Sequence, residues 1–161
     1  MRSEQEVNDA VERYSDMVLR LCMVYLKHPQ DAEDIFQTVF LKYALSEKNF
    51  ESDEHEKAWM IRVTANTCKD VLKSLFRSRT VPLEEAADCM MEMNEEQSRV
   101  LQEVCALPKD YREVIYLHYY EGYTAPEIAG ILQKNPNTVY THLRRAKDLL
   151  RERLGGETDE E

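Results

Sequence analysis

The sequence predicts an all-α protein made of two small helical domains. Apolar residues recur at intervals of three or four along most of the chain, which is the period of an α-helix with one buried face. No segment of the sequence shows the strict alternation of a strand, and only 4 glycines and 5 prolines interrupt the helix-forming residues. With 161 residues, the chain is long enough for one ordinary domain or two small ones.

The first half of the sequence contains three apolar stripes of helical period. The segment HPQD interrupts the first stripe, and we expect Asp31 to be the N-cap of the helix that follows. The polar segment SEKNFESDEHE, residues 46–56, separates the second stripe from the third and is predicted to be a loop. The three helices are therefore predicted at residues 5–27, 32–45 and 57–76.

A linker is predicted after the third helix. Residues 80–95 contain Pro82 and five acidic side chains but no Lys or Arg. A proline break within a run of one charge sign is typical of a segment between domains. Helical patterns resume at residues 96–106 and 109–121, on either side of Leu107-Pro108.

Two short helices joined by a tight break follow. Thr124 and Glu127 have the spacing of a capping box, with Pro126 in the first turn. This helix must end by Gln133–Lys134, because Asn135-Pro136 follows and the residue before a proline resists helical geometry. The same pair is expected to start the next helix, with the asparagine as N-cap and the proline as first residue.

Two helices with a break of about three residues have the geometry of a helix-turn-helix. Val139, Leu143, Ala146 and Leu150 are predicted to face the core. The outward face combines amide, hydroxyl, aromatic and guanidinium groups, which can read base edges and hold phosphates in a major groove. An ordinary antiparallel helix pair is the alternative. The outward residues are Asn137, Thr138, Tyr140, Thr141, Arg144 and Arg145.

The charge pattern adds to this interpretation. The formal net charge is −10, yet residues 56–79 and 134–154 each carry six Lys or Arg against two Asp or Glu. Two basic segments in an acidic chain can engage a polyanion, while the surrounding acids oppose non-specific binding. Solvated helix faces would give the same pattern and are the alternative for either segment.

Several function classes are disfavoured by what the sequence lacks. No apolar run approaches the ~20 residues that cross a bilayer, and the segment MRSEQEVNDAVERY is too polar for a signal peptide. No Gly-rich phosphate loop, metal-ligand cluster or nucleophile–base pair is evident, so we expect no enzyme, cofactor or metal. The cysteines have no C-x-x-C spacing, so we expect reduced and mostly core-filling thiols in a cytoplasmic protein, at Cys22, Cys68, Cys89 and Cys105.

Three stretches of the sequence resemble parts of one known family. LPKDYREVIYLHYYEGYTAPEIAGIL followed by NTVYTHLRRAKDLLRERL is similar to the minus-35-reading domain of the extracytoplasmic-function (ECF) sigma factors. HPQDAEDIFQTVFLKYA is similar to their region that docks on the clamp helices of RNA polymerase. KAWMIRVTANTCKDVLKS resembles their minus-10-reading helix, with Trp59, Ile61, Asn66 and Asp70 in matching order. The resemblance covers essentially residues 8–154, and two such modules in this order are more specific than a helix-turn-helix alone.

The resemblance implies a transcription initiation factor that binds core RNA polymerase and directs it to promoters with minus-10 and minus-35 elements. The implied partners are core RNA polymerase, promoter DNA and an anti-sigma factor, for a monomer with no membrane contact of its own. The implied domains are a three-helix sigma region 2 at 1–77, a flexible acidic linker at 78–95, a four-helix sigma region 4 at 96–154 and a disordered acidic tail at 155–161.

Two other classes of protein remain as alternatives. A helix-turn-helix regulator that acts without polymerase would need a dimerisation or ligand-sensing module, and the first half of the chain resembles neither. A helical adaptor that does not bind DNA would explain the acidity but not the two basic segments. Binding of duplex DNA by the protein alone would favour the regulator.

The resemblance also implies site residues. It assigns the minus-35 element to the outward residues of the predicted helix-turn-helix, and it places a flipped minus-10 base around Asn49, Phe50 and Glu51. Trp59 either stacks on a base or anchors the core. The further minus-10 residues are Arg62, Asn66, Lys69 and Lys73, which share one helix face. The implied polymerase-binding residues are Asp31, Asp34, Gln37, Thr38 and Leu41, although the acids among them also suit the N-terminus of a helix.

Two positions depart from the family pattern. Gln133 occupies the turn where glycine is usual, and a left-handed conformation there costs a side chain about 1–2 kcal/mol. Lys134 stands where an apolar residue is usual, which leaves the tilt of the second helix open. The acids of the predicted linker either mimic nucleic-acid charge or belong to a solvated tether; they are Glu84, Glu85, Asp88 and Glu92.

Overall fold

The computed structural model describes residues 1–26, 29–78 and 95–153. All regular structure in these ranges is α-helical, which confirms the predicted fold class. The chain divides into two compact units, Met1–Met90 and Met91–Glu161, and each is described by itself. None of the described helices is both long enough and apolar enough to cross a membrane. Most of the predicted linker and the predicted tail lie outside the described residues.

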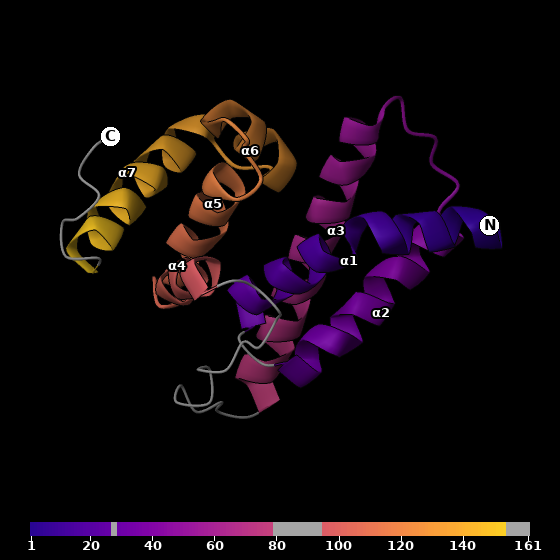
Figure 1. The fold of residues 1–161 in the computed structure, drawn as a ribbon, viewed down its shortest axis with the longest axis horizontal. Coiled ribbons are helices and arrows are strands. Elements are labelled where there is room, and N and C mark those ends of the chain that lie inside the picture. The colour runs from indigo at the N-terminus through magenta and orange to yellow at the C-terminus, as the bar shows by residue number, and fades with distance from the viewer. Residues whose placement is uncertain (27–28, 79–94, 154–161) are drawn as a thin grey trace. The chain divides into compact units, whose positions relative to one another are not determined.

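The first unit is a bundle of three helices, α1 (Glu4–Leu26), α2 (Pro29–Leu45) and α3 (Asp53–Ser78), each of which packs on the other two (Figure 1). The apolar stripes meet in its core, where Val18, Leu21, Val39 and Ile61 are fully buried. Cys22 and Cys68 are also buried, which confirms that these thiols fill the core.

Two helix starts in the first unit differ from the prediction. Asp31 is not an N-cap, because α2 already begins at Pro29 and Asp31 lies in its first turn. The fixed φ of a proline suits the first helical position, and an acid in the first turn interacts favourably with the helix dipole. α3 begins at Asp53, four residues before its predicted start, and the Ser52 hydroxyl accepts a hydrogen bond from His55 N at 3.1 Å. The loop is therefore shorter than predicted, at residues 46–52.

The second unit contains α4 (Glu95–Cys105), α5 (Lys109–Tyr119), α6 (Ala125–Leu132) and α7 (Pro136–Arg153), as predicted. α7 packs on α5 and α6, and α4 packs on α5 (Figure 1). Val139 is fully buried, and the small residue Ala129 is buried on α6, so α6 and α7 form the predicted helix-turn-helix. Leu143 and Ala146 face the core as predicted, whereas Leu150 is half-buried.

The starts of α6 and α7 follow the predicted capping pattern. The Thr124 hydroxyl accepts a hydrogen bond from Glu127 N, and the Glu127 carboxylate accepts one from Thr124 N. Asn135 Oδ1 accepts a hydrogen bond from Asn137 N at 2.8 Å, so it caps α7. Gln133 has φ 58° and ψ 50°, which is the left-handed conformation that usually favours glycine.

Replacement of Gln133 by glycine is expected to raise the free energy of unfolding by up to about 1 kcal/mol. The glycine relieves a left-handed backbone strain of about 1–2 kcal/mol. Part of this gain is offset because glycine raises the conformational entropy of the unfolded chain. The matched control is Gly122→Ala, because Gly122 has φ 79° and a methyl group there meets no atom within 4 Å. This control is expected to lower stability through backbone strain alone. Chemical denaturation measures the free energy of unfolding of both variants. A change of the same sign in both would show that Gln133 is not strained by its left-handed conformation.

A buried ion pair fixes the start of the α6–α7 turn. Lys134 Nζ lies 2.5 Å from Glu113 Oε2 on α5, and the Glu113 side chain is 3% exposed. This contact explains why a lysine replaces the usual apolar residue at position 134, because its ammonium group neutralises a carboxylate that the core encloses. Lys134 N also donates to Ala129 O at 2.9 Å, so backbone and side chain both hold the turn.

Candidate nucleic-acid interface

The outward face of α7 carries the residues to which the family resemblance assigns the minus-35 element. Asn137, Thr138, Arg144 and Arg145 are exposed, Tyr140 is 54% exposed, and Thr141 is partly exposed. These positions lie on the side of α7 opposite its buried residues, so the structure brings them together on one face. Among the described residues, neither arginine has an ion-pair partner, and both are available to a phosphate or a base.

A second polar stripe runs along α3. Arg62, Asn66, Lys69 and Lys73 follow one another at intervals of four, three and four, and α3 is helical throughout this range. Asn66 and Lys73 are exposed, whereas Arg62 and Lys69 are half-buried. The ammonium group of Lys69 lies 5.8 Å from the ring centroid of Tyr25, which holds its aliphatic stem against the bundle.

A third face, on α2, combines acid and apolar groups. Asp34 and Gln37 are exposed and Leu41 is 59% exposed, whereas Asp31 and Thr38 are half-buried. The Thr38 hydroxyl donates to Asp34 O at 3.0 Å, so it is partly used within the helix. Leu45, one turn beyond Leu41, is equally exposed on this face. The sequence analysis missed it, although the spacing of four residues was a usable signal.

The segment 46–52 borders a cavity of about 510 Å³ in the first unit. Asn49, Phe50 and Glu51, around which the family resemblance places a flipped base, are among the residues that line it. The sequence analysis missed the contribution of α1, which supplies an acidic and basic wall to the same cavity. The full lining is Arg2, Glu6, Asp9, Ala10, Arg13, Tyr43, Asn49, Phe50, Glu51, Ser52, Asp53 and Glu56.

Comparisons with known proteins identify the family of this chain. Residues 10–80 match the Sigma-70 region 2 family, and residues 97–150 match the Sigma-70 region 4 family. The chain is 30% identical to the RNA polymerase sigma factor SigV of Bacillus subtilis over 138 residues, which cover 84% of this chain and 82% of SigV. The chain belongs to the ECF family of RNA polymerase sigma factors.

A further relative supports the family membership of this sigma factor, and a solved structure supports its fold. It is 26% identical to the ECF RNA polymerase sigma factor SigW of Bacillus subtilis, over 91% of this chain and 87% of SigW. Its fold is similar to that of the sigma factor RpoE in a co-crystal structure with the anti-sigma factor NepR from Bartonella quintana, with a TM-score of 0.76 and 17% identity over 95% of this chain and 99% of RpoE. The sigma factor therefore directs RNA polymerase to promoters at the start of transcription.

Trp59 of this sigma factor is half-buried and is not among the residues that line the cavity. Its ring meets Phe50 and Tyr43 edge-on, with centroid distances of 5.6 Å and 6.0 Å. Edge-to-face packing at these distances stabilises an aromatic cluster. Of the two roles that the sequence left open, the geometry favours the core anchor.

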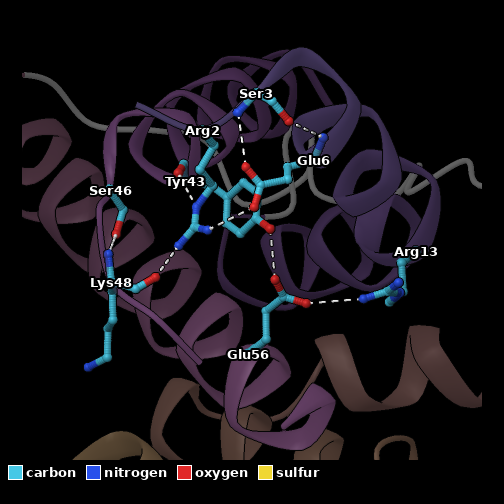
Figure 2. Close-up of polar contacts among 8 residues, drawn as sticks. All are labelled: Arg2, Ser3, Glu6, Arg13, Tyr43, Ser46, Lys48 and Glu56. Atoms are coloured by element: carbon cyan, nitrogen blue, oxygen red, sulfur yellow. Dashed lines mark hydrogen bonds and ion pairs between the residues drawn. The ribbon is translucent and has the colours of Figure 1, made fainter. Parts of the chain in front are cut away.

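One carboxylate joins all three helices of region 2 beside the cavity. The Glu56 carboxylate accepts hydrogen bonds from Arg13 Nη1 at 3.1 Å and from Tyr43 OH at 2.7 Å (Figure 2). It also accepts one from Tyr14 OH at 2.9 Å. Burial, together with the nearby Glu56 charge, raises the pKa of Tyr14 and of Tyr43 to about 12. Both phenols therefore stay protonated as donors throughout the neutral range.

Region 2 is expected to lose stability in alkali. Because the two phenols have a pKa of about 12 in the folded state and about 10 when unfolded, the folded protein binds more protons between these values. Their contribution is complete below pH 10 and disappears as the pH rises through 12. Urea denaturation across this window, followed by Trp59 fluorescence, measures the loss. A Tyr14→Phe, Tyr43→Phe variant should have a lower free energy of unfolding at neutral pH, and this free energy should fall less steeply between pH 10 and pH 12. An equally steep fall would show that these two phenols are not the cause.

Proposed function

We propose that this sigma factor holds promoter DNA at two separate surfaces, the α7 face and the α3 stripe with its cavity, while its α2 face docks on polymerase. The observation that carries this proposal is the exposed α7 face, where two guanidinium groups accompany amide and hydroxyl groups on one side of a helix-turn-helix. Region 2 would span 1–77 and region 4 would span 96–154, joined by an acidic linker over 78–95 and followed by the acidic tail 155–161.

The α7 face suits the major groove of a minus-35 element. The N-terminal residues of a recognition helix approach the base edges, so Asn137, Thr138 and Thr141 are placed to read bases. Arg144 and Arg145 can contact guanine edges bidentately or neutralise phosphates. Tyr140 adds an exposed aromatic ring that can pack against the sugar backbone or a thymine methyl group.

The cavity suits a single base of the melted minus-10 strand. It is lined by more carboxylates than guanidiniums, so it favours the N–H donors of a base over a phosphate. Extrusion of a base costs a few kcal/mol, which pocket contacts can repay. The α3 stripe would then follow the strand backbone with Arg62, Lys69 and Lys73, while Asn66 touches a base edge.

The α2 face suits a basic and partly apolar surface of polymerase. Asp31, Asp34 and Gln37 provide complementary charge and polarity, Thr38 extends this surface, and Leu41 provides exposed apolar area. Charge complementarity of this kind raises the rate of association and fixes the register. No chemistry is assigned to the sigma factor itself, and no cofactor is required.

An anti-sigma factor is proposed as a further partner. Similar folds are found in RpoE bound to NepR and in CnrH bound to the cytosolic domain of CnrY, the latter with a TM-score of 0.65 and 22% identity over 97% of this chain and 92% of CnrH. We propose that such a partner covers the DNA-reading faces of a monomeric, cytoplasmic sigma factor.

Run-off transcription with core RNA polymerase on a promoter library tests the proposal. We expect promoter-specific starts only when both polymerase and this protein are present, and no shift of promoter duplex by the protein alone. If the folded protein shifts duplex DNA unaided and supports no specific start, the helix-turn-helix regulator is the better description.

A further inference from the structure

Arg2 connects three parts of region 2 that are distant in the sequence. Its backbone N donates to Ala44 O at 2.9 Å, and its guanidinium donates to Tyr43 O at 3.0 Å and to Lys48 O at 2.5 Å (Figure 2). It also pairs with Glu6 at 3.8 Å. The side chain is only 10% exposed, so this guanidinium is enclosed by its partners rather than solvated at the surface.

The same guanidinium packs against two aromatic rings of the cavity wall. Its central carbon lies 4.4 Å from the ring centroid of Tyr43 and 5.2 Å from that of Phe50. The two rings are parallel, with centroids 6.5 Å apart. Planar stacking on aromatic faces, combined with a fixed fork of donors, is a property of arginine that lysine does not share.

Glu6 is the ion-pair partner of the same guanidinium. Ser3 and Glu6 form a capping box at the start of α1, in which Glu6 Oε1 accepts from Ser3 N at 3.0 Å and Ser3 Oγ accepts from Glu6 N at 3.1 Å (Figure 2). The carboxylate that caps the helix therefore also faces Arg2. Both groups are pre-oriented before any ligand arrives, which lowers the entropy lost on binding.

We propose that Arg2 is a positioning residue that holds segment 46–52 in the conformation that opens the cavity to a base. This inference rests on the proposed minus-10 function. Arg2 acts through Phe50 and the backbone carbonyl of Lys48 rather than on the DNA, because its donors already point to these protein groups. Loss of Arg2 frees Phe50 and Asn49 to move, so the cavity no longer has one shape to offer a base.

Trp59 fluorescence reports directly on the contact between Arg2 and segment 46–52, without DNA or polymerase. The chain contains 1 tryptophan, and its ring packs against Phe50 and Tyr43, the two rings that Arg2 covers. In the Arg2→Ala variant, we expect acrylamide to quench Trp59 more strongly and the emission to shift to the red. Arg2→Lys should resemble the alanine variant, since it keeps the charge but not the planar fork.

The matched control is Arg13→Ala, which removes the other guanidinium that lines the cavity. Arg13 pairs with Asp53 and Glu56 and makes no contact with the Lys48 carbonyl. We expect Trp59 quenching in this variant to stay at the wild-type value. If Trp59 quenching in Arg2→Ala equals the wild-type value, or if it increases equally in both variants, Arg2 does not hold segment 46–52 as proposed.

Promoter selection tests the functional part of the inference. Run-off transcription is measured on promoters that differ by single bases in the minus-10 element, and on a second set that differ in the minus-35 element. Arg2→Ala is expected to reduce discrimination at one minus-10 position by about tenfold, the equivalent of one hydrogen bond between the cavity and the base that is lost when segment 46–52 moves. Preferences in the minus-35 set should stay unchanged, whereas a general loss of stability would lower output from both sets in parallel.

The two levels of failure are distinguishable. If the wild-type protein supports no specific start, the proposed function fails, while Trp59 quenching still decides whether Arg2 holds the segment. If the wild type is active and the Arg2→Ala variant keeps every minus-10 preference, the positioning role is wrong. Should the alanine variant fail to fold by circular dichroism, Arg2→Lys decides instead, and wild-type quenching and preferences in that variant would overturn the inference.

Discussion

Replacement of both Arg144 and Arg145 by glutamate is expected to reduce transcription from minus-35-dependent promoters at least about a hundredfold, because each bidentate arginine contact to a base is worth about 1–3 kcal/mol. Both side chains are exposed on the outward face of α7. The reversal replaces attraction to DNA by repulsion without disturbing the buried face of the helix. Run-off transcription with core polymerase measures the effect.

The matched control for this prediction reverses two arginines near the end of the same helix. Arg151 and Arg153 pair at the surface with Asp148 and Glu103, at 3.5 Å and 3.8 Å. Exposed pairs of this kind contribute at most about 1 kcal/mol, so Arg151→Glu with Arg153→Glu should fold and keep most of its promoter activity. Equal losses in the two double variants would show that net charge matters rather than the α7 face.

Replacement of Lys134 by methionine is expected to destabilise region 4 by about 3 kcal/mol, because it removes the ammonium group from a buried carboxylate. The Glu113 side chain is 3% exposed and the Lys134 side chain is 21% exposed, so water cannot readily replace the lysine. Hydrogen exchange of the α5 and α7 amides reports on region 4 separately, which matters because two units need not unfold as one.

A second substitution distinguishes charge from packing in this pair. In the double variant Glu113→Gln, Lys134→Met, a neutral amide replaces the buried carboxylate, so no unpaired charge remains. Much of the lost protection of the α5 and α7 amides from hydrogen exchange should therefore return. If the double variant is no more stable than Lys134→Met alone, the methionine damages packing and the ion pair is not the cause.

Local patterns in the sequence predicted most of the helices and the helix-turn-helix. Thr124 with Glu127 and Asn135 with Pro136 are adjacent in the chain, so their capping roles follow from spacing alone. The start of α3 was missed because its first turn is polar and hides the apolar period. Asp31 was wrongly predicted as an N-cap because an aspartate suits both the N-cap and the first turn of a helix.

Contacts between distant segments could not be predicted in the same way. Arg2 and Lys48 are separated by 46 positions, and nothing in the sequence near either residue indicates that they meet. Lys134 reads as a departure from the family pattern until Glu113 is seen beside it. The cavity likewise depends on how α1, α2 and α3 pack, which apolar spacing does not specify. The implied roles of the α7, α3 and α2 faces stay predictions until the variants are measured.

The position of Met1 has a practical consequence for labelling. Met1 is 85% exposed and precedes the residue that covers the cavity wall. A fluorophore or affinity tag attached there would emerge beside the cavity that we propose for a minus-10 base. Under the proposed minus-10 role, a dye at this point would be well placed for energy transfer to a labelled promoter, and a bulky fusion partner at the same place would obstruct the melted strand.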